Sequence, residues 1–282
     1  MKRQKRAAAI HDISGFGKCS LTAALPIISA AGIETAAIPT AVLSTHTAFK
    51  PGFTCRDLTE DLEPFVDNWL DNGFEFDAVY SGFLGSAKQI SIVASLIGKL
   101  SGKDTIKIVD PAMADNGKMY SSFDLSFAGE MARLCECADV IVPNLTEAAF
   151  LLGREFRPGA LNEEQTAELA CALFEKCGAA VVLTGVSFDG KNIGAAVYAP
   201  KDGLQTFFRP RIPENYSGTG DVFASVLTAA LIKGRTLSRA VQIAVDFTYE
   251  CILRTYREYP GMVYGVDFED SLYKLKKMTE ED

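Results

Sequence analysis

The feature that most constrains the fold of this chain is a regular alternation of short apolar segments with longer segments of helical spacing. The expected strands lie at residues 7–10, 35–39, 78–80, 105–109, 140–142 and 179–184. The expected helices lie at residues 21–31, 58–72, 87–100, 126–137, 146–152, 162–177, 220–232 and 237–250. Two further strands, 194–198 and 206–209, flank a polar turn and predict a hairpin. This order is typical of an α/β fold with a mainly parallel central sheet and helices on both faces.

The chain has 282 residues, of which 48% are hydrophobic and 23% are charged. This length is within the range of one α/β domain, and the composition suits a globular protein with a large core. No low-complexity or linker-like segment interrupts the alternation. We therefore expect a single domain over residues 1–282.

The charge balance bears on the class of partner. A net charge of −8 is poorly suited to holding nucleic acid or an anionic membrane surface. No apolar run is long enough to span a bilayer. A basic start, ending at Arg6, is followed by only four apolar residues before His11, so we expect no secretion signal. The seven cysteines form no metal-like double CxxC, which favours reduced thiols and a cytoplasmic location.

In open parallel sheets, ligands bind beyond the carboxyl ends of the strands. Polar or glycine residues that directly follow the expected strands are therefore candidates for function. They are Asp12, His46, Gly82, Asp110, Asn144, Thr184 and the loop before Asp221.

The sequence Ser-Gly-Thr-Gly-Asp-Val-Phe at 217–223 precedes a long apolar helix. Gly218 and Gly220 permit a tight turn whose N–H groups, at a helix N-terminus, can hold an anion such as a phosphoryl group in transfer. Asp221 is placed to accept a proton from an attacking hydroxyl. A plain helix cap by Thr219 and Asp221 explains the same residues, and this motif by itself does not decide between the two.

The segment Pro-Asn-Leu-Thr-Glu at 143–147 also opens a helix after a strand. Asn144 and Glu147 are three residues apart, so both side chains face one side of the first turn. Their oxygens can hold waters around Mg²⁺, which keeps several waters in proteins. A local capping box between the two residues is the alternative.

Asp110 ends a strand and precedes Pro111, where a carboxylate can orient a metal ion or a triphosphate. A simple turn before proline is the alternative. The run Asp115-Asn116-Gly117 predicts a turn, from which the Asp115 carboxylate can still reach the site.

Residues 11–18, His-Asp-Ile-Ser-Gly-Phe-Gly-Lys, match neither a dinucleotide-binding fingerprint nor a P-loop. A substrate loop is the better interpretation, with Ser14 inside it and Asp12 available to a ring hydroxyl or ring nitrogen. A lone histidine is usually structural, but His46 lies in a polar segment after a strand beside an aromatic residue, which makes substrate contact an alternative to that role. Phe83 lies between glycines and can form an apolar wall.

Taken in order, these segments resemble the ribokinase-like superfamily, and within it the branch of pyridoxal and pyridoxamine (vitamin B6) kinases. Residues 218–221 resemble the anion hole and catalytic aspartate of the superfamily, which gives Gly218, Thr219, Gly220 and Asp221 catalytic roles. Asn144 and Glu147 match its Asn-x-x-Glu motif, which organises Mg²⁺ and phosphates.

Other segments resemble the B6 branch itself. Residues 43–47 resemble its Ser-Asn-His-Thr segment, which implies substrate contacts for His46 and Thr47. Residues 81–86 resemble its Ser-Gly-Tyr-Leu-Gly-Ser segment, which implies that Phe83 lies near the pyridine ring. The resemblance also implies an ATP and metal site, formed by Asp110, Asp115, Asn144, Glu147, Thr184, Gly185, Arg211, Ile212 and Tyr216. Within this set, Asp110 and Glu147 are the expected metal-site residues.

The implied activity is ATP-dependent phosphorylation of the 5′-hydroxymethyl group of a B6 vitamer by a homodimer, with Mg²⁺ and a monovalent cation such as K⁺ as cofactors. Three departures from the B6 pattern leave the preferred ring open: Asp12 replaces Ser, Thr45 replaces Asn and Phe83 replaces Tyr.

A hydroxymethylpyrimidine kinase of thiamine synthesis, or a dual-specificity enzyme, is the alternative, although that branch often carries Cys where this chain has Asp221. A non-catalytic ligand-binding protein of the same fold is a third interpretation. A sugar or nucleoside kinase is disfavoured because no lid insertion is evident near the N-terminus.

Overall fold

The computed structural model describes residues 3–47, 49, 52–121, 123–262 and 264–280. Its main sheet has nine strands in the order β11-β10-β9-β8-β5-β4-β1-β2-β3. The parallel strands are β1 (Arg6–Ser14), β2 (Glu34–Leu43), β4 (Ala78–Ser81), β5 (Ile106–Val109), β8 (Val140–Ile141) and β9 (Ala180–Val186). Antiparallel strands border them, namely β3 (Cys55–Asp57), β10 (Asn192–Ala199) and β11 (Gly203–Pro210). The predicted parallel sheet and the predicted hairpin are both confirmed.

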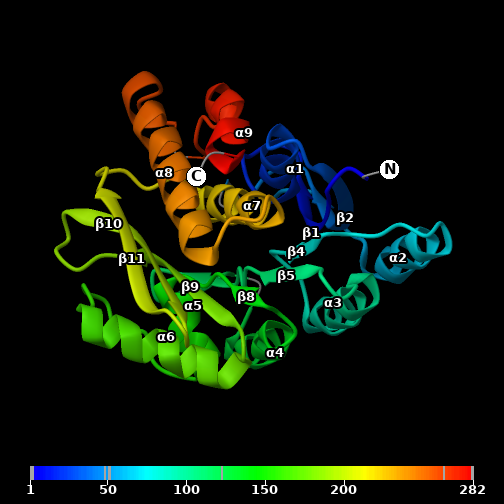
Figure 1. Ribbon diagram of the computed structural model, residues 1–282, viewed down its shortest axis with the longest axis horizontal. Coiled ribbons are helices and arrows are strands. Elements are labelled where there is room, and N and C mark those ends of the chain that lie inside the picture. Colours follow the sequence, from blue (N-terminus) through cyan, green and yellow to red (C-terminus); the bar gives the residue numbers. More distant parts are fainter. Residues whose placement is uncertain (1–2, 48, 50–51, 122, 263, 281–282) are drawn as a thin grey trace.

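Helices cover both faces of this sheet, as predicted (Figure 1). One face carries α1 (Ser20–Ala30), α7 (Thr219–Ile232), α8 (Leu237–Glu258) and α9 (Leu272–Glu280). The other carries α2 (Leu62–Asp71), α3 (Ala87–Leu100), α4 (Leu125–Cys135), α5 (Leu145–Leu151) and α6 (Glu163–Cys177). Each layer buries its own hydrophobic cluster against the sheet, which is the arrangement that a doubly covered parallel sheet requires.

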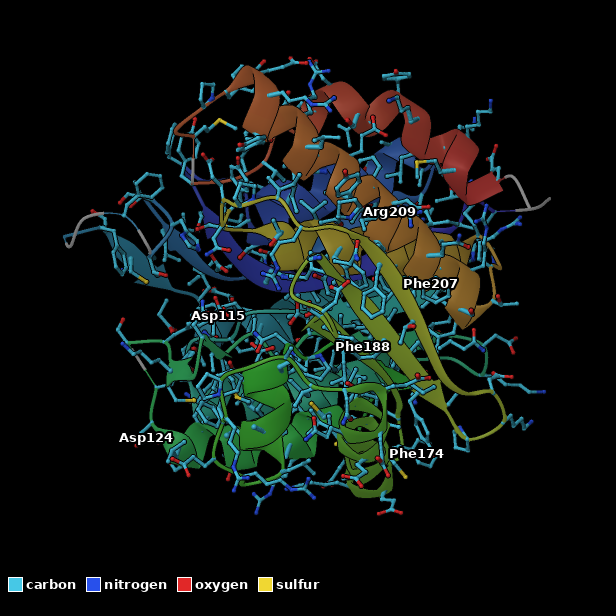
Figure 2. The ribbon with its side chains drawn as sticks, turned by 90° about the vertical axis from the view of Figure 1, so that its left-hand side faces the viewer. Asp115, Asp124, Phe174, Phe188, Phe207 and Arg209 are labelled. Carbon is cyan, nitrogen blue, oxygen red and sulfur yellow. The ribbon has the colours of Figure 1, made fainter. Side chains whose placement is uncertain are left out.

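Successive side chains of β11 pack alternately against the two helical layers. Phe207 packs against the cluster below α8, whereas Phe208 points to the opposite cluster and meets the ring of Phe188 at 5.0 Å between centroids. Arg209 forms an ion pair with Asp246 of α8. Figure 2 shows Phe207 and Arg209 beside that helix. Because side chains alternate along a strand, successive residues of this half-buried edge strand contact the two helical layers in turn.

The structure corrects the helix predicted over residues 58–72. That segment follows β3 directly, continues as a 3-10 turn η1 (Thr59–Asp61), and becomes helical only in α2. The backbone N–H of Leu58 donates to the carbonyl of Thr40 in β2, and the N–H of Thr59 donates to the Asp57 carboxylate at 2.8 Å. These two hydrogen bonds hold the start of the segment against the edge of the sheet. They depend on residues outside the segment, so its helical spacing does not reveal them.

Several elements extend or add to the predicted pattern. Helix α8 continues to Glu258 because its buried face extends through Cys251 and Thr255. A small hairpin of β6 (Ala114–Asp115) and β7 (Lys118–Met119), a second 3-10 turn η2 (Glu269–Ser271) and the helix α9 were not predicted. Within the described ranges, no helix is long and apolar enough to cross a membrane, and all seven cysteines are free thiols.

Candidate active site

The carboxyl ends of the parallel strands bring the predicted polar residues to one edge of the sheet. Asp12 lies near the end of β1, and Asp110 follows β5 with its N–H donating to the carbonyl of Ser81 at 2.8 Å. Asn144 follows β8 and forms a bridge with Thr184 of β9. Residues separated by more than 170 positions in the sequence thus share one edge, as the topology of the fold predicts.

The turn before α7 lies against the loop before α1. Gly218 is the N-cap of α7 with φ of +74°, and a Cβ atom there would lie 2.0 Å from the carbonyl oxygen of Lys18. Only glycine fits such a close approach with this backbone conformation. The N–H groups of Thr219, Gly220 and Asp221 belong to the first turn of α7, where a helix has no internal acceptors. They are therefore available for the anion-binding role predicted for this turn.

Asp221 does not cap its own helix, because no side chain caps the start of α7. The plain-cap interpretation of this motif is therefore wrong. The Asp221 carboxylate instead interacts with the backbone N–H of Ser20, the first residue of α1, which opposes the rise of the Asp221 pKa. Burial raises the pKa of Asp221 to about 7, and the nearby charge of Asp12 adds to this effect. A carboxylate with a pKa near 7 is well matched to proton transfer at neutral pH.

Asp110 and Glu147 place two more carboxylates beside Asp221. Burial raises the pKa of Asp110 well above its usual value, and the charges of Glu147 and Asp221 raise it further. The backbone at Gly220 comes close as well, since a Cβ there would lie 4.0 Å from Oδ2 of Asp110. Clustered carboxylates of this kind suit a divalent cation, which relieves their mutual repulsion.

Asn144 and Glu147 form the capping box that was the alternative to a metal role. The Asn144 side chain accepts from the N–H groups of Thr146 and Glu147, while Oε2 of Glu147 accepts from the N–H of Asn144 at 2.9 Å. The other oxygen, Oε1, accepts from the N–H of Met113 at 3.0 Å. Burial raises the pKa of Glu147 to about 8 even though these amides oppose the shift.

Asp115 lies in the β6–β7 hairpin, at the turn predicted for residues 115–117. Its carboxylate accepts from the backbone N–H and the side-chain amide of Asn116, both at 2.8 Å. The N–H of Gly117 donates to Oγ1 of Thr146 at 3.0 Å, which ties this hairpin to the first turn of α5. Figure 2 shows Asp115 at the surface of the molecule. Its negative charge contributes to the raised pKa of Glu147.

The predicted acceptor loop gathers Asp12, Ser14 and His46. Oγ of Ser14 donates to Oδ2 of Asp12 at 3.1 Å, and the N–H of His46 donates to the carbonyl of Phe16 at 2.9 Å. Burial raises the pKa of Asp12, while hydrogen bonds from Ser20 and Ser14 oppose that shift. Burial lowers the pKa of His46, and the Asp12 charge opposes it. Thr47 follows His46 on the exposed side of the loop.

Phe83 belongs to an aromatic group with Tyr120 and Phe123. Its ring lies 5.5 Å from Phe123 and 6.4 Å from Tyr120, measured between centroids. Gly82 fixes the backbone before it, because a Cβ at Gly82 would lie 2.2 Å from Nδ1 of His11. Tyr120 was not predicted as a site residue from the sequence. Burial raises its pKa, and the charges of Glu147 and Asp110 raise it further, so Tyr120 lies near these acids. No spacing pattern marks it, since it follows a hairpin that the sequence did not predict.

A pocket of about 260 Å³ lies beyond the carboxyl end of β9. It is lined by Leu145, Gly159, Ala160, Gly185, Ser187, Gly190 and Arg211. Two predicted nucleotide contacts, Gly185 and Arg211, are thus brought together. Ile212 and Tyr216 do not line this pocket. The ring of Tyr216 belongs to the core below α7, and its hydroxyl donates to Glu214 at 2.8 Å.

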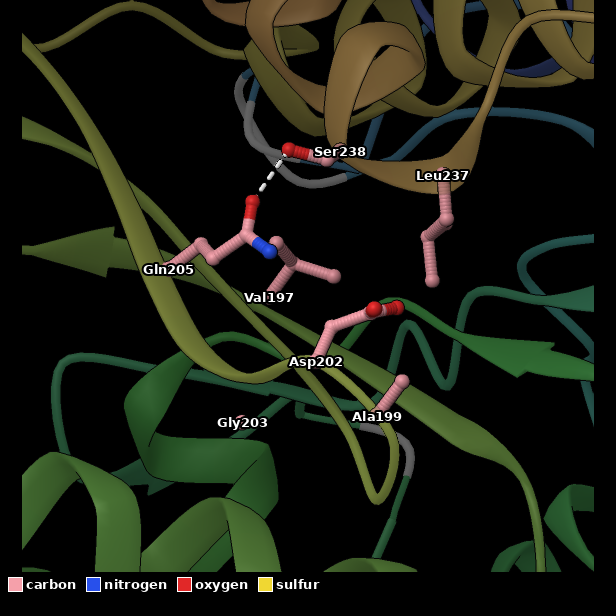
Figure 3. A pocket seen from close by; sticks show the side chains of 7 residues that line it. All are labelled: Val197, Ala199, Asp202, Gly203, Gln205, Leu237 and Ser238. Atoms are coloured by element: carbon pink, nitrogen blue, oxygen red, sulfur yellow. Dashed lines mark hydrogen bonds between the residues drawn. The ribbon is translucent and has the colours of Figure 1, made fainter.

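A second pocket, of about 10 Å³, lies between the β10–β11 turn and the start of α8 (Figure 3). Ser238 donates to Oε1 of Gln205 across it. Tyr198 at this end of β10 pairs with Val181 at the start of β9. This pocket therefore lies at the amino edge of the sheet, opposite the acids, and has room for about one water molecule.

Comparison with known proteins places this site in a family. A family model described as phosphomethylpyrimidine kinase matches residues 22–264. A protein of Bacteroides thetaiotaomicron, provisionally described as a phosphomethylpyrimidine kinase and crystallised with pyridoxal, is 35% identical with a TM-score of 0.91, over 97% of this chain and 96% of that one. The pyridoxal kinase of Lactobacillus plantarum is 28% identical with a TM-score of 0.89, over 99% of both chains. A pyridoxal kinase of Photobacterium profundum is 27% identical over 86% of this chain and 84% of its own length.

Proposed function

Since this chain belongs to the phosphomethylpyrimidine kinase family, we propose that it transfers the γ-phosphoryl group of ATP to the 5′-hydroxymethyl group of pyridoxal, pyridoxamine or pyridoxine. The single observation that carries the proposal is the position of Asp221. It lies at the anion-binding turn of α7, beside Asp110 and the acceptor loop, with a pKa of about 7. The similarity to a solved structure that contains pyridoxal supports the choice of ring.

In this reaction, Asp221 accepts the proton of the attacking hydroxymethyl group. The oxygen then attacks the γ-phosphorus in line, and the bond to the β-phosphate oxygen breaks. The amides of Gly218, Thr219 and Gly220 stabilise the negative charge that spreads over the transferred group. The close contact between Gly218 and Lys18 holds this turn beside the acceptor loop before any ligand arrives.

The acceptor ring lies between the Asp12–Ser14 segment, the His46–Thr47 segment and Phe83. The Asp12 carboxylate accepts from a ring hydroxyl or a protonated ring nitrogen. The Ser14 hydroxyl donates to one of its oxygens, Oδ2, and a carboxylate is a stronger acceptor than a hydroxyl. Phe83 supplies an apolar face without the hydroxyl that a tyrosine would add.

The nucleotide occupies the pocket at Gly185 and Arg211, with its phosphates directed toward Asn144 and Thr184. Arg211 is exposed at the pocket and supplies a cation for a phosphate. We retain Ile212 as an adenine-side residue by its neighbouring position. Tyr216 contributes through the packing of the loop, because its ring is buried in the core.

The acid cluster fits Mg²⁺, which would neutralise the phosphates and draw charge from the γ-phosphoryl group. Asp110 is the residue that would hold it directly. Glu147 accepts backbone N–H groups at both oxygens, so it would act on the waters around the ion and through its charge. In the described part of the chain, no group of three or more His, Cys, Asp or Glu side chains is placed to hold a metal ion. A requirement for K⁺ stays a prediction, and turnover in potassium compared with tetramethylammonium salts tests it.

A hydroxymethylpyrimidine kinase, or a dual-specificity enzyme, is the second candidate, because the matching family model is described by a pyrimidine substrate. Asp221 and the segment of residues 44–47 favour the B6 ring. A non-catalytic binding protein is disfavoured, because Asp221, Asn144 and Glu147 are all in place at one edge.

The deciding experiment is ATP turnover on matched concentrations of pyridoxal, pyridoxamine, pyridoxine and hydroxymethylpyrimidine. Turnover of the B6 vitamers supports the proposal, whereas turnover of the pyrimidine alone moves the enzyme to the second candidate. An absence of turnover on all four, with a correctly folded protein, supports the binding protein. We also propose a cytoplasmic homodimer, for which light scattering after size exclusion would give about twice the mass of 30.5 kDa.

A further inference from the structure

The segment between α8 and α9 returns to the loop before α1. Nζ of Lys18 lies 2.6 Å from Oε2 of Glu269 and 5.4 Å from the centroid of the Phe268 ring. A Cβ at Gly265 would lie 2.5 Å from Cβ of Lys18, so the backbone there packs directly on this side chain. Figure 1 shows α9 beside α1, at the end of this return. The segment 264–269, called here the C-terminal strap, is therefore in contact with the acceptor loop.

The strap is fixed to α8 from its other side. The N–H of Asp267 donates to Oγ1 of Thr255 at 2.7 Å, and Nε of Arg254 lies 2.7 Å from Oδ2 of Asp267. Asp267 is buried and paired on both its backbone and its carboxylate. The acid of this ion pair is buried and its arginine is partly exposed, so loss of Arg254 would leave a buried charge without its ion-pair partner. The strap is thus a fixed part of the fold.

Tyr264 begins the strap and meets two aromatic rings from distant segments. Its centroid lies 5.3 Å from that of Phe16 and 5.8 Å from that of Phe49, and the latter two are 5.7 Å apart. Phe16 belongs to the acceptor loop, and Phe49 follows His46 in the connection from β2 to β3. We call these residues the aromatic triad. Three separate parts of the chain thus supply rings to one place.

The triad lies directly at the acceptor loop. The N–H of Phe16 donates to the carbonyl of Ser44 at 3.1 Å, and its carbonyl accepts from His46 at 2.9 Å. The side chain of Phe16 is nevertheless 54% exposed. A large apolar ring that is held by its backbone beside His46 and left exposed offers a surface on which a flat ligand can bury area.

We propose that Tyr264 is an acceptor-binding residue: with Phe16 and Phe49 it forms a wall against which the planar ring of the acceptor packs. The strap holds this wall in place through Lys18, so Glu269 is a positioning residue. This inference rests on the proposed function for the reaction and deepens it by naming the ligand class, a planar heteroaromatic alcohol. An aliphatic or sugar alcohol would gain little from the wall, because it has no flat π-face to stack.

The test compares Tyr264→Ala and Tyr264→Phe with a matched control, Tyr273→Ala. Tyr273 lies on α9 and is 76% exposed, and among the described residues it meets no other aromatic ring. Kinetics gives kcat and the KM for acceptor and for ATP, and calorimetry gives the affinity for pyridoxine without ATP. We expect Tyr264→Ala to raise the acceptor KM and the pyridoxine Kd about five- to tenfold, which is the range for one aromatic contact. The KM of Tyr264→Ala for ATP should change less than about twofold. The acceptor KM and the pyridoxine Kd of Tyr264→Phe and of Tyr273→Ala should also change less than about twofold.

Glu269→Gln tests the positioning role in the same assays. We expect a smaller rise of the acceptor KM, about two- to threefold, with kcat and the KM for ATP unchanged. The inference is overturned if Tyr264→Ala leaves the acceptor KM and the pyridoxine Kd unchanged. It is equally overturned if kcat and both KM values worsen together, because that pattern marks a general loss of structure.

The two proposals fail in different ways. If the wild-type chain phosphorylates none of the vitamers but binds pyridoxine, and Tyr264→Ala weakens that binding, the wall stands and the proposed reaction fails. If the wild-type chain binds no planar ring alcohol at all, both are wrong. If turnover occurs and Tyr264→Ala matches the wild-type chain, only the wall is wrong.

Discussion

The backbone N–H of Ser20 interacts with the Asp221 carboxylate and opposes the rise of its pKa, so the first turns of α7 and α1 meet at one acid. Ser20 adopts a positive φ of 49°, which is unusual for a residue other than glycine. This contact orients the proposed base without a second side chain. It also places the base between the anion-binding turn and the acceptor loop, since α1 follows that loop directly.

The first prediction concerns the pH dependence of the reaction. A base must be ionised, so kcat/KM should fall about tenfold per pH unit below the Asp221 pKa of about 7 and level off above it. Asp221→Asn should lower kcat by about 10² to 10⁴ and remove this acidic limb. Turnover between pH 5.5 and 9 measures both, with circular dichroism to verify folding. A folded Asp221→Asn variant with near-wild-type kcat would exclude Asp221 as the base.

The second prediction concerns stability without metal. Because the pKa of Asp110 is raised in the folded state, the folded protein holds this proton more tightly than the unfolded chain does. Stability is therefore greatest below the unfolded pKa of about 4 and falls as the pH rises above it. Asp110→Asn removes this loss and should raise the free energy of unfolding at pH 8 by about 1 kcal/mol or more, a Tm gain of about 2–4 °C.

Thermal melts in EDTA at pH 4.5 and pH 8 measure this effect, and the gain should nearly vanish at the lower pH. Asp104→Asn is the control, because Asp104 is exposed and precedes β5, whereas Asp110 follows the opposite end of that strand. The same Asp110→Asn variant should lose the Mg²⁺-dependent turnover. Equal melting temperatures of Asp110→Asn and wild type at pH 8 would show that the acids do not repel one another.

The third prediction separates packing from backbone strain at the anion-binding turn. Gly218 and Gly153 have similar φ values, +74° and +67°, but a Cβ at Gly218 would lie 2.0 Å from the Lys18 carbonyl, whereas one at Gly153 meets no atom within 4 Å. Gly153→Ala should cost about 1 kcal/mol of unfolding free energy with kcat unchanged. Gly218→Ala should cost more and should also lower kcat at least about tenfold, because the turn must move away from the acceptor loop. Urea unfolding and turnover measure the pair, and an equal effect of the two substitutions on kcat would argue against the anion-hole role.

The fourth prediction tests the nucleotide pocket. Arg211→Met keeps much of the side-chain length but removes the charge, so the KM for ATP should rise about tenfold while the acceptor KM stays the same. Arg133→Met is the control, since Arg133 is on the surface of α4, 73% exposed, and its guanidinium pairs with Glu130. Steady-state kinetics with each substrate varied in turn gives both constants. A change confined to the acceptor KM would move Arg211 out of the nucleotide site.

The sequence predicted more of the fold than of the contacts that make the site. Strong apolar periodicity located α3 at residues 87–100, the same bounds that the structure has. The short hairpin β6–β7 was not predicted, because its two-residue strands carry no periodicity. Tyr120, which follows that hairpin, was missed for the same reason. Tyr264 was missed because it lies in a loop, where no regular spacing marks it.

For two motifs, the local sequence allowed both a helix cap and a functional role. At Asn144 and Glu147 the sequence allowed either a cap or a phosphate and metal role, and the structure shows that the cap is made while Glu147 remains beside Asp110. At Asp221 the sequence allowed a cap or a base, and the structure excludes the cap. A capping box is a contact within four residues and can be read locally, whereas the partner of Asp221 is 201 positions away.

The sequence by itself determined the alternation of strands and helices, the position of each polar residue at a strand end, and the family that its motifs resemble. These are local properties, because apolar spacing and glycine placement act within a few residues. Only the tertiary structure decided which acids share a site, why their pKa values rise, and that the C-terminal strap brings Tyr264 to Phe16. Burial and charge repulsion depend on distances between remote segments, and those distances exist only after the sheet and its two helical layers have assembled.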